Sequence, residues 1–243
     1  MRWMTAFLMA GLVTTPLLAQ SPVPINTIAP LSEIELLVAR HFKTLEKSLE
    51  EAARFDAAKN KSIRTDFGML SLLGQAIAEH PDNADSKING PALRDAALAY
   101  QRKGTHTEAQ AALAKIQSVL AGEVTGEHVR LHPWNKLINM HPMMEEVNSS
   151  SSDILKVLKR TRGKPEEVLP ATSWALLAVA MKADTHEVKN PADLPKWNAW
   201  SDEFLESSLK LADLIRNKKG EGGREWFDKA HETCNACHEV FRD

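Results

Sequence analysis

The sequence predicts an all-α fold arranged as two tandem up-down-up-down four-helix bundles. The chain has a single tyrosine and few alternating β-branched residues, while Ala, Leu, Glu and Lys recur at helical spacing. Glycine and proline divide these stretches into eight helical segments joined by short connections. Hydrophobic residues occupy 43% of the 243 positions and charged residues 26%, a globular composition that excludes disorder of the whole chain.

The charge balance argues against a polyanionic partner. The 30 Lys and Arg residues nearly balance the 32 Asp and Glu residues, which gives a formal net charge of −2. Because the basic residues are scattered along the chain, no nucleic-acid partner is predicted.

The first residues predict export. Arg2 precedes an apolar run over 6–18 that is too short for a comfortable membrane span, and cleavage is expected after Ala19. Residues 1–19 are therefore expected to be a signal peptide of a periplasmic or otherwise exported protein. Leu17 stands where a small residue is preferred, so an uncleaved membrane anchor is the alternative. The Pro-rich residues 20–30 are expected to form a linker.

Residues 31–122 are expected to form the first bundle, without a cofactor. Its four helices are predicted over 32–60, 62–80, 90–103 and 105–122. Ser32 and Glu35 have the spacing of a capping box at the start of the first helix, Pro81 follows the second, and Gly104 separates the third from the fourth. This half has no cysteine, and His41 is interpreted as a polar or core histidine rather than as a ligand.

Residues 131–243 are expected to form the second bundle. Its helices are predicted over 142–163, 165–186, 195–220 and 224–242. Proline begins each of the first three, and the last helix aligns Phe227, Cys234 and His238 on one face. The fourth helix of each half follows a glycine and has comparable apolar spacing, which suggests a duplication; a single eight-helix domain is the alternative.

The only two cysteines, Cys234 and Cys237, form a C-x-x-C pair followed directly by His238. Thiols three residues apart on a helix lie on neighbouring parts of one face, where each can add to a vinyl group of haem. The next imidazole can then bind the iron, which is the c-type attachment pattern. One covalent haem c also explains why an exported chain keeps its sole cysteines in one C-x-x-C.

Other uses of this motif fit the surroundings less well. A thioredoxin-like redox pair needs a helix N-terminus after a strand, whereas this pair lies near the end of a terminal helix. A structural zinc site would need a fourth ligand, and the adjacent Cys237 and His238 are awkwardly placed to chelate one ion. An incidental buried pair of cysteines is the remaining alternative.

The stretch "CNACHEVFR" at the end of a four-helix pattern resembles the class II cytochromes c, the cytochrome c′ family, over residues 131–243. The resemblance implies that Cys234 and Cys237 form the thioether bonds and that His238 is the proximal iron ligand. It also implies that Phe241 packs on the haem and that Arg242 pairs with a propionate. Simple members of the family lack the N-terminal bundle, so the family's docking or dimer surface is not carried over.

Bundle geometry predicts the rest of the pocket. Only five residues follow His238, so any sixth iron ligand must come from upstream. In an antiparallel bundle the end of the fourth helix lies level with the starts of the first and third helices and with the end of the second. The residues expected at this level are Met140–Met144, Met181, Trp197 and Trp200. The alternative for each of them is an ordinary place in the core.

Met144 is the first choice as iron ligand because it lies inside the predicted helix, one turn past its start. Met140 and His141, at the helix start, are substitutes, and Met143 is expected to point about 100° away. A pocket in which these methionines only line an apolar wall is the alternative.

These features predict an exported mono-haem c-type cytochrome that transfers single electrons to a redox partner protein and is not an enzyme. The alternative is a five-coordinate haem protein that binds a diatomic gas such as nitric oxide. A methionine ligand suits electron transfer, whereas an open site suits gas binding. A third hypothesis makes the haem bundle one module of a scaffold whose N-terminal bundle recognises the redox partner.

Overall fold

A computed structural model describes residues 20–242, so the expected signal peptide over 1–19 lies outside the described residues. Within this range the chain forms α-helices and short 3₁₀ turns and no strand, which confirms the all-α fold class. The helices are α1 (Ile25–Ile28), α2 (Leu31–Leu49), α3 (Ala52–Ala58), α4 (Ser62–Glu79), α5 (Gly90–Leu98), α6 (His106–Leu120), α7 (Met140–Lys159), α8 (Leu169–Ala183), α9 (Leu194–Arg216) and α10 (Gly223–Phe241). None of the helices within 20–242 combines the length and apolar character needed to span a bilayer.

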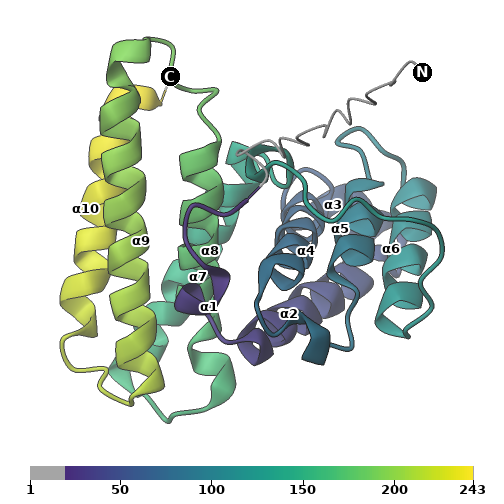
Figure 1. The fold of residues 1–243 in the computed structure, drawn as a ribbon, viewed down its shortest axis with the longest axis horizontal. Coiled ribbons are helices and arrows are strands. Elements are labelled where there is room, and N and C mark those ends of the chain that lie inside the picture. The colour runs from purple at the N-terminus through teal and green to yellow at the C-terminus, as the bar shows by residue number, and fades with distance from the viewer. Residues whose placement is uncertain (1–19, 243) are drawn as a thin grey trace, which may run out of the picture.

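The helices gather in two groups (Figure 1). In the first group, α4 packs against α2 and α5, while α6 packs against α5 and α2. In the second, α8 packs against α7 and α9, and α10 packs against α9 and α7. Each group is therefore a closed ring of four helices, with the small α3 set beside α2, α4 and α6.

Two helices are buried almost all round because they also join the groups. Helix α4 contacts α7, and α8 contacts both α1 and α2. Their sequences fit this position, since apolar and small residues occupy nearly every face of α8, which is buried from Leu169 to Met181. A helix that is apolar on all sides belongs in a protein interior.

The connection between the groups is held by a buried arginine. Arg94 on α5 donates hydrogen bonds from Nη1 to the Gln75 side-chain oxygen at 2.8 Å and to the Arg130 carbonyl at 3.0 Å, and from Nη2 to the Val129 carbonyl. Its side chain is fully buried. The loop before η3 (Trp134–Lys136) is thus fixed on the first group, which positions the start of α7.

Several details differ from the sequence-based expectation; for example, the helix expected over 165–186 runs from Leu169 to Ala183. The expected capping box is wrong: α2 starts at Leu31 after Pro30, and Glu35 instead accepts a hydrogen bond from Ser86 Oγ at 2.7 Å. The predicted first helix ends at Leu49 rather than near Asn60, with α3 as a separate helix. The segment 20–30, expected as a linker, contains α1, whose Ile25 and Ile28 are buried in the core.

Candidate functional site

Helix α10 carries the cysteine and histidine motif on its second half. Phe227, Ala230 and Thr233 are buried along one face, and this face continues into Cys234, which packs against the core. Cys237 and His238 follow within the last two turns and are half-buried. The burial pattern therefore turns the motif toward the inside of the α7–α10 group.

The three motif residues line one cavity of about 430 Å³, within the range of roughly 300–1,000 Å³ of ligand pockets. All four helices of the second group contribute to its wall. The lining residues are Met140, His141, Met144, Glu145 and Asn148 from α7, Met181 from α8, Trp197, Trp200, Ser201 and Phe204 from α9, Thr233, Cys234, Cys237, His238 and Phe241 from α10, and the flanking Glu187 and Arg242. The structure thus brings the motif residues, Phe241, Arg242, Met181 and both tryptophans to one cavity, together with Met140, His141 and Met144 of the expected stretch Met140–Met144.

Three aromatic side chains form the wall next to the end of α10. The ring centroid of Phe241 lies 5.0 Å from that of Trp197 and 5.9 Å from that of Trp200, both in edge-on geometry. Trp197 is fixed in turn by the hydrogen bond that its Nε1 donates to the Met181 carbonyl at 3.0 Å. Edge-on aromatic pairs are favourable, so this wall holds the last turn of α10 against α9.

The first turns of α7 separate its methionines as expected from helical geometry. Met140 and Met144 line the cavity and are half-buried, whereas Met143 is fully buried in the core and does not line it. His141 also lines the cavity, but its side chain is 63% exposed and its Nε2 lies 3.9 Å from Glu145 Oε1. Of the candidate iron ligands on α7, the two methionines are therefore the better enclosed.

Both thiols have raised pKa values and are therefore protonated at neutral pH. Burial and the neighbouring Cys237 raise the pKa of Cys234 to about 12, and burial raises the pKa of Cys237 to about 11. Burial and the charge of Arg242 lower the pKa of His238, which favours the neutral imidazole needed of a metal ligand. Reactive C-x-x-C pairs of redox enzymes have lowered thiol pKa values, so the setting of this pair is unlike theirs.

Several cavity residues are absent from the sequence-based set. Asn148 lies one turn beyond Met144, and Phe204 lies on the apolar stripe that includes Trp200, so helical spacing could have found both. Ser201 and Thr233 also line the cavity. Their hydroxyls donate hydrogen bonds to the backbone carbonyls four residues earlier, those of Trp197 and Lys229. Glu187 belongs to the connection after α8, and no spacing rule points to it.

The residues present fit a covalently held haem c. The cavity of about 430 Å³ has the size of a ligand pocket. It is lined by two thiols and an imidazole from one helix face, by aromatic rings and by two thioethers from α7. No group of three or more His, Cys, Asp or Glu side chains arranged to hold a metal ion occurs in the described part of the chain. Comparisons of the chain with protein-family models, with curated proteins and with solved structures found no match.

Proposed function

We propose that the chain is an exported mono-haem c-type cytochrome that transfers single electrons and is not an enzyme. The observation that carries this proposal is that Cys234, Cys237 and His238 open onto the same cavity as Met144. We infer further that residues 131–243 act as the haem-carrying four-helix bundle and residues 31–122 as a haem-free one. The ring of contacts within each group supports that division.

The two thiols would attach the cofactor through thioether bonds. Each addition would join the cysteine sulfur to one vinyl carbon and move the thiol hydrogen to the other, so it would need no oxidant. Their three-residue spacing on α10 presents both sulfurs to the cavity. The protonated state of both thiols fits this addition, since each must supply a hydrogen.

The remaining side chains would set the properties of the site. A bound haem would supply an iron that accepts and releases one electron. His238 and Met144 would bind the iron, with Met140 or His141 as substitutes for Met144. A thioether ligand raises the reduction potential, as does burial against Trp197 and Phe241. Arg242, exposed at the end of α10, would balance a propionate charge.

Gas binding is the second candidate function. Met181, Phe204 and Trp200 line the cavity beside the methionines, so an apolar pocket would remain if neither methionine bound the iron. A five-coordinate site with such a wall would admit a diatomic gas such as nitric oxide. The spin state of the ferric protein distinguishes the two functions.

The test is expression of the full chain in a host that matures c-type cytochromes in its periplasm. A pyridine haemochrome assay should give one haem per chain that survives acid extraction, and the double variant Cys234→Ala/Cys237→Ala should give none. Asn235→Gln is the matched control, since Asn235 is exposed between the cysteines and leaves their spacing unchanged. Recovery of stably folded wild-type protein without haem from such a host would overturn the proposal.

A further inference from the structure

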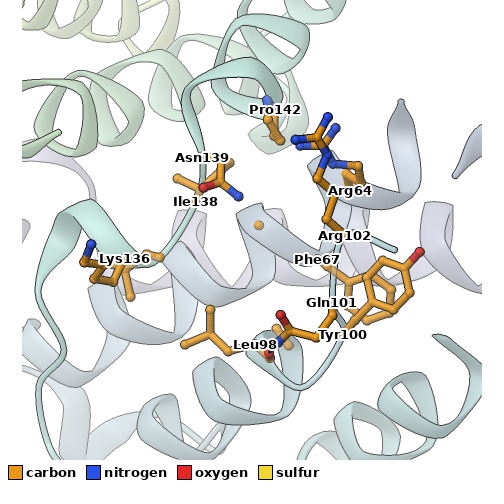
Figure 2. Close-up of a pocket in the computed structure, with 13 residues that line it drawn as sticks. Arg64, Phe67, Leu98, Tyr100, Gln101, Arg102, Lys136, Ile138, Asn139 and Pro142 are labelled. Carbon is orange, nitrogen blue, oxygen red and sulfur yellow. Dashed lines mark hydrogen bonds between the residues drawn. The ribbon is translucent and has the colours of Figure 1, made fainter. Parts of the chain in front are cut away.

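A second cavity, of about 290 Å³, lies between the first helix group and the start of α7 (Figure 2). Its wall comes from α4, from the end of α5 and the turn after it, and from the segment that leads into α7. The lining residues are Arg64, Phe67, Gly68, Ala97, Leu98, Tyr100, Gln101, Arg102, Lys136, Leu137, Ile138, Asn139 and Pro142. This cavity and the proposed haem cavity share no lining residue, so the two are distinct sites.

The charged residues that line this cavity are all positive. Three of its lining residues are cationic and none is acidic. Burial and the like charge of Arg102 lower the pKa of Arg64, which means that the two guanidinium groups act on each other unfavourably. Within residues 20–242, neither arginine takes part in a hydrogen bond or an ion pair with a side chain of the protein. Two unpaired arginines at one pocket are the arrangement that an oxyanion would neutralise.

The two arginines lie together on one side of the cavity. Figure 2 shows the guanidinium groups of Arg64 and Arg102 on the Pro142 side, with the Lys136 amine at the other end. Asn139 and Pro142 also bring the start of α7 to this cavity. Asn139 precedes the helix without capping it through its side chain, so the first amides of α7 add positive potential on the same side.

Apart from Gln101 and Asn139, the rest of the wall is apolar. Phe67 and Tyr100 stack with ring centroids 4.5 Å apart, and Leu98, Leu137 and Ile138 complete the surface. The backbone at Gly104 lies close to the Tyr100 ring, since a Cβ at that position would be 2.7 Å from a ring carbon. The cavity thus joins a cationic side to a preformed apolar surface, which suits a ligand with an anionic head and an apolar body.

From these features we propose that the cavity binds a small phosphate monoester whose apolar body is about the size of one aromatic ring. Two arginines favour a doubly charged head over a single carboxylate, because a phosphate monoester carries a charge of about −1.5 to −2 at neutral pH and offers three acceptor oxygens. The cavity volume of about 290 Å³ leaves no room for an apolar part much larger than one ring. This site does not depend on the haem, so it stands or falls independently of the proposed function.

The experiment is calorimetric titration of the full chain with phenyl phosphate. Three control ligands are titrated in the same way. Inorganic phosphate measures the affinity for the anionic group alone, and phenol measures the affinity for the aromatic ring alone. Benzoate measures the affinity for a ring with a single negative charge. Phenyl phosphate should bind saturably and more tightly than each of the three. Arg64→Gln and Arg102→Gln should each weaken it by about tenfold or more, as expected for the loss of a hydrogen bond to a charged group.

Lys103→Gln is the matched control, because Lys103 is exposed next to Arg102 and does not line the cavity. It should leave binding unchanged, and circular dichroism should show the same helix content in all three variants. Absence of saturable phenyl phosphate binding at millimolar concentrations would overturn the proposal. Equal weakening by Lys103→Gln, or tighter binding of benzoate than of phenyl phosphate, would also overturn it. So would binding to phosphatidylglycerol vesicles without binding of the soluble probe, since the site would then serve a lipid surface.

Discussion

His41 on α2 and Asp66 on α4 form a buried pair in which the imidazole Nδ1 lies 2.9 Å from the carboxylate Oδ1. The other ring nitrogen, Nε2, lies 3.9 Å from Glu146 Oε1 on α7. Glu146 in turn accepts a hydrogen bond from Ser173 Oγ on α8 at 3.1 Å. Residues from four helices and both helix groups therefore meet at one titratable cluster.

This cluster makes the stability of the protein depend on pH. Burial alone would lower the pKa of His41, but the charges of Glu146 and Asp66 and the Asp66 hydrogen bond outweigh it, and the pKa is raised above 6.5. The stabilisation by protonated His41 is therefore fully present below pH 6.5 and is lost as the pH rises through the higher pKa of the folded state. Urea denaturation at pH values on both sides of 6.5 should show this decline.

The variant His41→Gln should remove that pH dependence. Below pH 6.5 it should lower the free energy of unfolding by about 3–5 kcal/mol, since it leaves the buried Asp66 and Glu146 without a counter-charge. His141→Gln is the control because its side chain is 63% exposed. Equal pH dependence in the wild type and in His41→Gln would show that another group is responsible.

A second prediction concerns an ion pair that joins the two helix groups. Arg216 on α9 donates hydrogen bonds from Nε and Nη2 to the two carboxylate oxygens of Glu33 on α2, at 2.6 and 2.8 Å. Arg216→Met should cost about 3 kcal/mol, because the buried Glu33 is left unpaired. In urea denaturation the double variant Arg216→Met/Glu33→Gln should recover part of this loss.

Arg224→Met is the control for that measurement. Arg224 pairs with Asp228 one turn along α10, and both are exposed, so its replacement should change stability little. A similar loss in Arg216→Met and Arg224→Met would contradict a special role for the Glu33 pair.

Local signals allowed much of the fold to be predicted. Pro81 after α4 and Gly104 before α6 end or separate helices through the backbone of the chain itself. The break after Leu49 has no such signal. There the Leu49 carbonyl lies 2.9 Å from His106 Nε2 and accepts a hydrogen bond from Gln110 Nε2 at 3.3 Å, so α6 caps the end of α2 through tertiary contacts. A contact between residues 57 positions apart cannot be predicted from local spacing.

The candidate site divides in the same way. The motif of Cys234, Cys237 and His238 is local, and the helical period distinguishes Met144 from Met143, so the place of these residues at the cavity could be predicted from spacing. The second cavity could not, because it depends on the approach of α4, the end of α5 and the start of α7. The approach is close at Gly68, where a side chain would meet Ile138 at 2.7 Å.

A third prediction tests the aromatic wall. Phe241→Ala removes the contacts with Trp197 and Trp200, each worth about 0.5–1.5 kcal/mol beyond buried area. Amide hydrogen exchange over residues 237–241 should become faster, because the last turn of α10 loses its anchor. Val240→Ala is the neighbouring control, since Val240 is 48% exposed, and it should leave exchange unchanged.

The last prediction distinguishes the two candidate functions by comparing variants of Met144 and Met143. These two residues are neighbours in the sequence, but their side chains lie in different surroundings. Met144 lines the cavity, whereas Met143 is fully buried away from it. If Met144 binds the iron, the ferric protein should be low-spin with a weak near-infrared sulfur-to-iron band, and Met144→Ala should lose both and lower the reduction potential. Met143→Ala should keep both spectral features while losing about 2–5 kcal/mol of stability, because it leaves a cavity in the core.

The opposite outcomes identify the other ligands or the other function. Loss of the low-spin spectrum in Met140→Ala but not in Met144→Ala would transfer the role to the methionine one turn earlier on the same face. A high-spin ferric spectrum in the wild type, with rapid nitric oxide binding, would support gas binding instead. In that case Met144→Ala should alter the rate of gas entry without altering the spin state, because the side chain would only line the open pocket.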